Sequence, residues 1–164
     1  MRNLSVAVSL LLGIACSCLA CGNASEPLPE PVITLELLVE PESEGRVKAH
    51  AVVTNAGSLP VYYYYGCGCG VYIGVHDAEG TPLRLSCGPD PLCPCDEVEL
   101  PPGKTLEASL EFRGETCVGE AFGELKPVPP GEYEIVASFS YSRVKWPNPR
   151  EYSDLHESYS FVWK

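Results

Sequence analysis

Closely spaced cysteines are the residues of this chain best suited to chemistry. The six cysteines that follow residue 31 are Cys67, Cys69, Cys87, Cys93, Cys95 and Cys117. Four of them form two Cys-x-Cys pairs, and such thiols can bind a soft metal ion, exchange electrons or form disulfides. The compartment selects among these chemistries, because thiols pair in oxidising surroundings and stay reduced in the cytosol.

The N-terminus predicts export from the cytoplasm. Arg2 precedes an apolar run over residues 4–15, and small residues follow before the sequence changes to Ser, Glu and Pro. This order is typical of a secretory signal peptide, which we expect over residues 1–20. The run is shorter than the roughly 20 apolar residues that span a bilayer, so a retained transmembrane helix is the weaker interpretation.

The end of this signal carries a candidate lipid anchor. The segment Leu19-Ala20-Cys21-Gly22 resembles the lipobox of bacterial lipoproteins, in which the cysteine is acylated and becomes the new N-terminus. Cys16 is the rival anchor, and a cleaved signal without lipid is the third alternative. Cys21 is preferred because it leaves six cysteines, an even set suited to three disulfides. By the same resemblance, Gly22 implies the outer membrane of the cell envelope.

Composition divides the rest of the chain into a spacer and a domain. Residues 21–31 are rich in Pro and Glu, which predicts an extended, flexible spacer. Residues 32–164 have the length of one domain. The formal net charge is −11 and becomes −12 once Arg2 leaves with the signal, so nucleic acid is excluded as a partner. We expect contact with the membrane through the lipid anchor, and a protein partner.

The domain is predicted to be all-β. Apolar and polar residues alternate over residues 33–39, 47–54, 105–112 and 133–141, as in strands with one buried face. Turn sequences rich in Asn, Asp, Gly and Pro separate these segments, and a last strand is expected at about 158–163. Seven or eight short strands indicate an antiparallel β-sandwich of immunoglobulin type, with a barrel as the second alternative.

Three segments resemble the BsuPI-type intracellular proteinase inhibitor family. They read VVTNAGSLPVYYYYG, VELPPGKTLEASLEF and PVPPGEYEIVASFSY, and they share with the family an asparagine turn and two strands entered through PPG. The resemblance implies an immunoglobulin-like module and inhibition of a proteinase. For an anchored envelope protein, we expect the partner to be a protease or an envelope component. The signal peptide and the six cysteines of the domain depart from that family.

The hairpin around Asp77 predicts one disulfide. The sequence Asp77-Ala-Glu-Gly80 favours a three-residue loop with a glycine bulge, in which residue 77 pairs with residue 81. Extending this register puts Val71 opposite Cys87, with Cys69 as the diagonal neighbour on the same face. We therefore expect a bond between Cys69 and Cys87, and disulfides among the remaining cysteines.

A thiolate metal site is the alternative use of the cysteines. Its four ligands for Zn²⁺ or Cu(I) would be Cys67, Cys69, Cys93 and Cys95. The spacing differs from the Cys-x₂₋₄-Cys of common zinc sites, and an exported chain meets oxidising conditions, so disulfides are preferred. The histidines, His50, His76 and His156, lie far apart in sequence. We expect no metal and no other cofactor.

Enzyme motifs such as G-x-S-x-G, H-E-x-x-H and the phosphate loop do not occur, so we expect a binding domain that is not an enzyme.

Four consecutive tyrosines, Tyr62 to Tyr65, offer a candidate binding face. By alternation from Val61, Tyr63 and Tyr65 should point into the core and Tyr62 and Tyr64 outward. Exposed tyrosines often anchor protein recognition, and ordinary packing between aromatic neighbours on the sheet is the alternative, which requires no partner. The sequence thus predicts a lipid-anchored envelope lipoprotein with a disulfide-bonded, inhibitor-like binding domain.

Overall fold

The computed structural model describes residues 30–41, 45–65, 70–88, 96–119, 123–148 and 151–164. All regular secondary structure in these ranges is β-strand, as predicted. The described residues therefore contain no helix that is long and apolar enough to cross a membrane. The expected anchor Cys21 and the signal and spacer before residue 30 lie outside these ranges.

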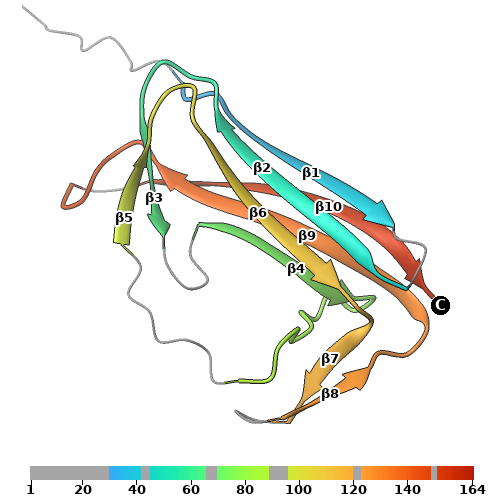
Figure 1. Cartoon of the computed structure of the whole chain (residues 1–164). Helices are drawn as coiled ribbons and strands as arrows, with labels where there is room; N and C mark the ends of the chain where they lie inside the picture. Colours follow the sequence, from blue (N-terminus) through green and yellow to red (C-terminus); the bar gives the residue numbers. More distant parts are fainter. Residues whose placement is uncertain (1–29, 42–44, 66–69, 89–95, 120–122, 149–150) are drawn as a thin grey trace, which may run out of the picture.

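One sheet has three strands in the order β1-β2-β6, all antiparallel (Figure 1). They are β1 (Ile33–Pro41), β2 (Val47–Asn55) and β6 (Thr105–Phe112). The central strand β2 carries buried residues at every second position, from Val47 to Asn55. The apolar side chains of this strand thus face the second sheet, as the alternation in the sequence predicts.

The other sheet has the order β10-β9-β3-β5, with β4 also paired to β9. Its strands are β3 (Val61–Tyr65), β4 (Val71–Asp77), β5 (Asp96–Leu100), β9 (Gly131–Ser142) and β10 (Tyr152–Trp163). Both β3 and β4 lie along the same edge of β9. Tyr62 stands opposite Ser142 and Val71 opposite Phe139, so the two strands pair with different stretches of β9.

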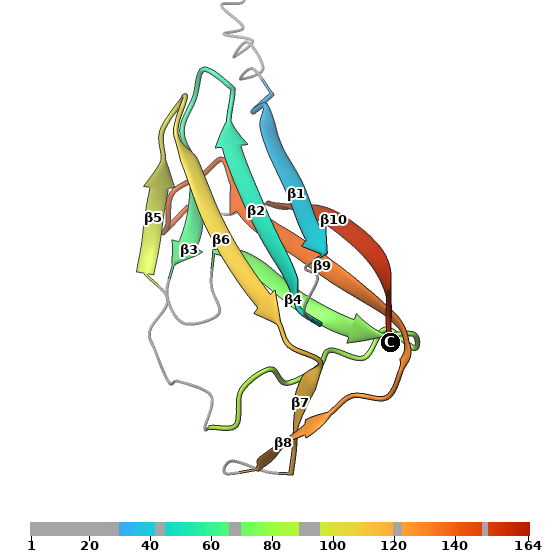
Figure 2. The ribbon, with the colours of Figure 1, turned by 45° about the vertical axis from the view of Figure 1, so that its right-hand side comes forward.

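The connectivity is that of an immunoglobulin-like sandwich. In the nomenclature of that fold, β1, β2 and β6 correspond to strands A, B and E. Strands β3 and β4 together correspond to C, and β9 and β10 correspond to F and G. The two sheets thus have the A-B-E and G-F-C orders of the immunoglobulin fold. The fold prediction is confirmed, and the barrel alternative is wrong because the strands form two separate main sheets. The strand count was too low: the described ranges hold ten strands, including a hairpin of β7 (Glu115–Val118) and β8 (Glu124–Pro127). This hairpin projects from one end of the sandwich (Figure 2).

The core between the sheets has two adjoining clusters. One surrounds Val53, Val61 and Phe139, all almost fully buried. The other surrounds Phe112, whose ring centroid lies 5.1 Å from that of Trp163 and 6.2 Å from that of Tyr133. These aromatic contacts hold the C-terminal end of β10 against the end of β6.

Asn55 joins the ends of the two sheets. Its side chain is fully buried, and Nδ2 donates hydrogen bonds of 2.9 Å to the carbonyls of Leu59 and Leu100. Oδ1 accepts a hydrogen bond of 3.0 Å from the Gly57 amide. Because β2 and β5 belong to different sheets, this one amide group fixes the loop after β2 and connects both layers.

Tyr133 forms a tyrosine corner, a feature of immunoglobulin-like domains. It lies at the start of β9, the strand equivalent to F, and its hydroxyl donates a hydrogen bond of 2.8 Å to the Pro129 carbonyl. The ring is buried between the sheets. Burial raises the pKa of Tyr133, and the carboxylates of Asp77 and Glu79 raise it further.

Tyr133→Phe is expected to lower the free energy of unfolding by about 1 kcal/mol, because it removes this hydrogen bond and leaves the ring in place. Urea unfolding followed by tryptophan fluorescence measures the change. The raised pKa adds a second readout: the neutral phenol stabilises the folded state fully below about pH 10, and this contribution is lost as pH rises through the folded pKa. The variant should lose part of that alkaline decline. Tyr159→Phe, an exposed position, is the control, and an equal effect of both substitutions would contradict the assignment.

Candidate functional site

The structure pairs Cys87 with Cys117 in a disulfide, with a Cα–Cα distance of 5.3 Å. The expected Cys69–Cys87 bond is therefore wrong. The turn itself is correct, since the Asp77 amide donates to the Thr81 carbonyl at 3.0 Å. The pairing within the hairpin, however, ends soon after Leu83, whose amide still donates a hydrogen bond to the Val75 carbonyl.

Beyond Leu83 the chain follows β7. The Arg84 carbonyl accepts a hydrogen bond of 2.6 Å from the Cys117 amide and one of 3.3 Å from the Thr116 hydroxyl. This contact brings Cys87 to Cys117, while β4 pairs with β9 along its other edge. The other cysteines of the domain, Cys67, Cys69, Cys93 and Cys95, lie outside the described residues.

Strand β3 alternates as predicted over its first four residues, from Val61 to Tyr64. Val61 and Tyr63 are buried, and Tyr63 packs against Phe139 with ring centroids 5.5 Å apart. Burial raises the pKa of Tyr63, with a smaller contribution from Tyr65. Tyr62 is half-buried and Tyr64 exposed on the outer face of the sheet.

Tyr65 departs from the prediction, because its side chain is 62% exposed and not part of the core. It ends β3 opposite Asp96, the first residue of β5. Alternation along a strand predicts which side chains are buried only where the opposite sheet covers that strand. At the end of a strand this prediction no longer holds. The tyrosine run thus presents Tyr64 and Tyr65 to solvent.

Further aromatic residues share the outer face of the β10-β9-β3-β5 sheet. Residues directly opposite one another across an antiparallel pair point to the same face. One row across four strands is Glu99, Tyr62, Ser142 and Tyr152, and Glu97 stands opposite Tyr64 in the next row. We call the group Tyr62, Tyr64, Tyr152 and Trp146 the tyrosine face.

Trp146 joins this face from the β9–β10 loop. Its side chain is 69% exposed, and its backbone amide donates to both carboxylate oxygens of Glu97 at 3.2 and 3.1 Å. Arg143 of the same loop forms an ion pair with Glu30, just before β1. These two contacts fix the loop between the outer strand β5 and the segment that enters the domain.

Tyr72 of β4 also points outward, but the fold explains its position. A Cβ atom built on Gly74 would lie 2.1 Å from the Tyr72 hydroxyl oxygen, so the tyrosine ring lies over the glycine. An aromatic ring that covers a glycine in a strand restores packing that the missing side chain cannot provide. We therefore leave Tyr72 out of the tyrosine face.

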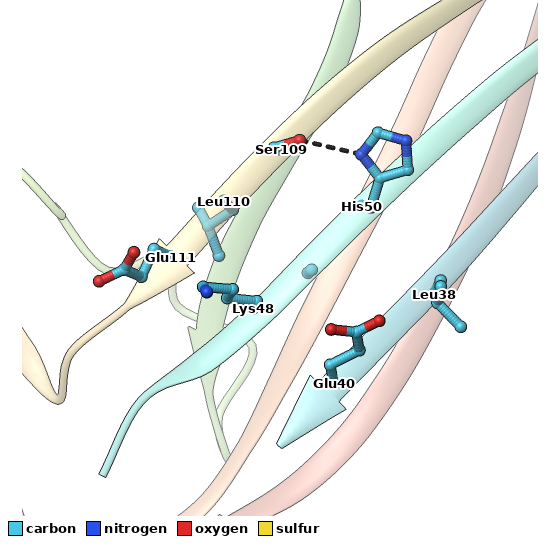
Figure 3. A pocket seen from close by; sticks show the side chains of 8 residues that line it. Leu38, Glu40, Lys48, His50, Ser109, Leu110 and Glu111 are labelled. Atoms are coloured by element: carbon cyan, nitrogen blue, oxygen red, sulfur yellow. Dashed lines mark hydrogen bonds between the residues drawn. The ribbon is translucent and has the colours of Figure 1, made fainter. Parts of the chain in front are cut away.

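The outer face of the β1-β2-β6 sheet contains a hollow of about 400 Å³, shown in Figure 3. Its lining residues are Leu38, Glu40, Lys48, Ala49, His50, Ser109, Leu110 and Glu111. His50 Nδ1 and the Ser109 hydroxyl share a hydrogen bond of 2.9 Å, and His50 Nε2 lies 3.7 Å from a Glu107 oxygen. At the rim, a hydrogen bond from Arg113 lowers the pKa of Glu111.

The Ser109, His50 and Glu107 side chains have the composition of a nucleophile, a base and a carboxylate. The 3.7 Å separation is longer than a hydrogen bond, and all three groups stand on the solvent face of paired strands. The amides of β2 are committed to ladders on both sides, so they cannot stabilise an oxyanion. Cross-strand pairing of polar residues explains this row.

Sequence reasoning missed two members of the tyrosine face and the Ser109–His50 contact. Tyr152 reaches the face of the β3 tyrosines through β9, and Trp146 through its amide contact with Glu97 of β5; both β9 and β5 lie far from β3 in the sequence. Within the described ranges no group of three or more His, Cys, Asp or Glu side chains is arranged to hold a metal ion. The four cysteines of the alternative metal site lie outside those ranges.

Comparisons with known proteins assign no family. No family model matches the chain, and no curated protein matches it. A structure of a protein assigned as ApaA from Bordetella pertussis aligns with a TM-score of 0.41 at 13% identity, over 82% of this chain and 95% of that one. A protein from Archaeoglobus fulgidus aligns at 0.38 and 10% identity, over 82% and 98%.

A β-glucosidase from Erythrobacter marinus aligns with a TM-score of 0.36 at 16% identity, over 77% of this chain and only 15% of the enzyme. These values are too low to support an inference about activity.

Proposed function

We propose that this protein is a membrane-anchored extracytoplasmic lipoprotein whose β-sandwich binds a partner protein through the tyrosine face and catalyses no reaction. One observation carries the proposal: Tyr62, Tyr64 and Tyr152 share one outer sheet face, and the exposed Trp146 is held at Glu97 of that face. Tyrosine and tryptophan dominate protein recognition because they supply large contact area with few rotatable bonds.

The position of the tyrosine face fits a tether at the N-terminus. The Glu30–Arg143 ion pair ties the segment before β1 to the loop that carries Trp146. A chain tethered through a lipid on Cys21 would thus enter the domain near the tyrosine face, which supports a partner in the envelope itself. A proteinase is the partner that the resemblance to the BsuPI family implies.

Photo-crosslinking in the native organism tests this function. A benzoylphenylalanine placed at Tyr64 should form a specific adduct in intact cells, which mass spectrometry can identify. The matched control places the same group at Leu38, which is 60% exposed on the opposite sheet. Cys21→Ser should move the protein from the membrane to the soluble fraction and should reduce the adduct formed at position 64.

An adduct at position 64 and none at position 38 supports the binding function. A proteinase in that adduct, inhibited by the purified domain, would support the inhibitor activity. Adducts of equal yield at both positions, or none at position 64, would contradict binding through the tyrosine face. If the Cys21→Ser variant stays in the membrane and the Cys16→Ser variant does not, the lipidated residue is Cys16.

A Cys-rich metal-binding lipoprotein is the second candidate. The Cys87–Cys117 bond uses neither Cys-x-Cys pair, so the four thiols of this alternative stay available as a set. The same bond also leaves an even number of cysteines for two further disulfides, the outcome we favour in an oxidising compartment. A count of free thiols separates the two.

A further inference from the structure

The tyrosine face carries negative charge among its rings. Glu99 stands opposite Tyr62 and Glu97 opposite Tyr64, so both carboxylates share the outer face with the tyrosines. On the other side, Asp154 of β10 accepts a hydrogen bond from Ser140. In the described part of the adjacent β9–β10 loop, the basic residues are Arg143, which is paired with Glu30, and Lys145. The face is thus aromatic and acidic together.

This combination is suited to cations. The face of a tryptophan or tyrosine ring attracts ammonium and guanidinium groups, tryptophan most strongly. Carboxylates nearby add charge-assisted hydrogen bonds, which are strongest for the planar guanidinium. An anionic partner would instead meet like charge both here and over a chain with net charge −11.

The spacing of these groups matches an extended peptide. Glu97 and Glu99 are two residues apart on β5, so they lie about 6.8 Å apart, which is also the distance between alternate side chains of an extended chain. The row from Glu99 to Tyr152 runs across the strands, roughly perpendicular to this direction, and crosses three strand spacings, about 14 Å, so an extended peptide that follows β5 finds a ring beside each carboxylate. A single small cation would fill a fraction of that row.

We infer that the tyrosine face, with Glu97 and Glu99, docks an extended basic segment of the partner protein, in which alternate Arg or Lys side chains meet the carboxylates and rings. This inference rests on the proposed binding function and adds the chemical class of the ligand. It predicts binding that weakens with salt, because the attraction is largely between exposed charges.

Tryptophan fluorescence of the purified domain provides the test. The probe is the peptide Arg-Gly-Arg-Gly-Arg, compared with Glu-Gly-Glu-Gly-Glu and with tetramethylammonium. The basic peptide should cause a saturable change that is lost in Trp146→Phe, while Trp163, partly buried against Phe112, contributes a constant background. The acidic peptide should cause none.

A charge-only variant locates the site. Glu97→Gln with Glu99→Gln should weaken binding of the basic peptide at least tenfold. The glutamine introduced at position 97 keeps a carbonyl that can accept the hydrogen bond from the Trp146 amide, so the loop should stay in place. The matched control, Glu107→Gln with Glu111→Gln on the opposite sheet, removes the same charge and should leave the affinity unchanged within twofold.

Equal weakening by both pairs would show general attraction to an acidic protein and would overturn the inference. No saturable response to the basic peptide, or equal binding of the acidic peptide, would also overturn it. Tighter binding of tetramethylammonium than of the peptide would assign a small-cation site in place of a docking face. If crosslinking at Tyr64 succeeds while the basic peptide fails, the ligand class alone is wrong; if both fail, the proposed binding function fails too.

Discussion

Replacing Asn55 by Asp is expected to lower the free energy of unfolding by about 3–5 kcal/mol, the cost of leaving a buried charge without a partner. The two side chains have nearly the same shape. The Asn55 amide group donates to the carbonyls of Leu59 and Leu100, whereas a carboxylate in its place would point an oxygen at both carbonyls. The site is fully buried, so water cannot compensate.

Urea unfolding of the purified domain measures this loss, with Asn148→Asp as the matched control. Asn148 lies exposed in the β9–β10 loop, and the same change of charge there should shift stability by less than about 0.5 kcal/mol. Burial disfavours ionisation of the carboxyl introduced at position 55, so this variant should recover part of its stability as pH falls and the carboxyl is protonated. Equal stability of the two variants would show that Asn55 does not join the sheets.

The long strands could be predicted from the sequence because one face of each is buried. Alternation placed strands at 47–54, 105–112 and 133–141, and the structure has β2, β6 and β9 at those positions. The four-residue strands β7 and β8 were missed because they are too short to show a period, and β8 is exposed throughout. Local pattern therefore predicts strands that face the core and misses strands that lie outside it.

Pairing between distant strands was harder to predict than the strands themselves. The outward direction of Tyr62 and Tyr64 follows from alternation within β3, without knowledge of the rest of the fold. Tyr152 joins them through the Tyr62–Ser142 register, and Trp146 through Glu97, which stands opposite Tyr64; no local signal specifies either pairing. The Cys69–Cys87 error has the same origin, because a correct turn was extended into a register that ends near Leu83, where the chain leaves β4 and contacts β7 instead.

Removal of the Cys87–Cys117 disulfide is expected to lower the free energy of unfolding by roughly 3.6 kcal/mol, the value that the chain-entropy model gives for a loop of about 30 residues. The two cysteines are 30 residues apart in sequence, so the bond restricts the unfolded chain to that extent. The bond also ties the segment after β4 to β7, which contacts that segment through the Arg84 carbonyl.

Urea unfolding without reductant tests the bond in three variants: Cys87→Ser, Cys117→Ser and the double substitution. Because each variant removes the same bond, all three should lose equal stability, and the effects of the two single substitutions should not add. Additive losses, or a double variant as stable as the wild type, would contradict the pairing.

The same proteins, unfolded and reacted with a thiol reagent, decide how the other cysteines are used. We expect no free thiol in the mature wild type, one in each single variant and none in the double variant, because Cys67, Cys69, Cys93 and Cys95 would be bonded to one another. Four free thiols in the wild type and the double variant, with stoichiometric bound metal before unfolding, would instead assign these four cysteines to a thiolate site and favour the metal-binding function. Since the Cys87–Cys117 bond lies outside both Cys-x-Cys pairs, the thiol count decides between the two assignments whatever the size of its stability effect.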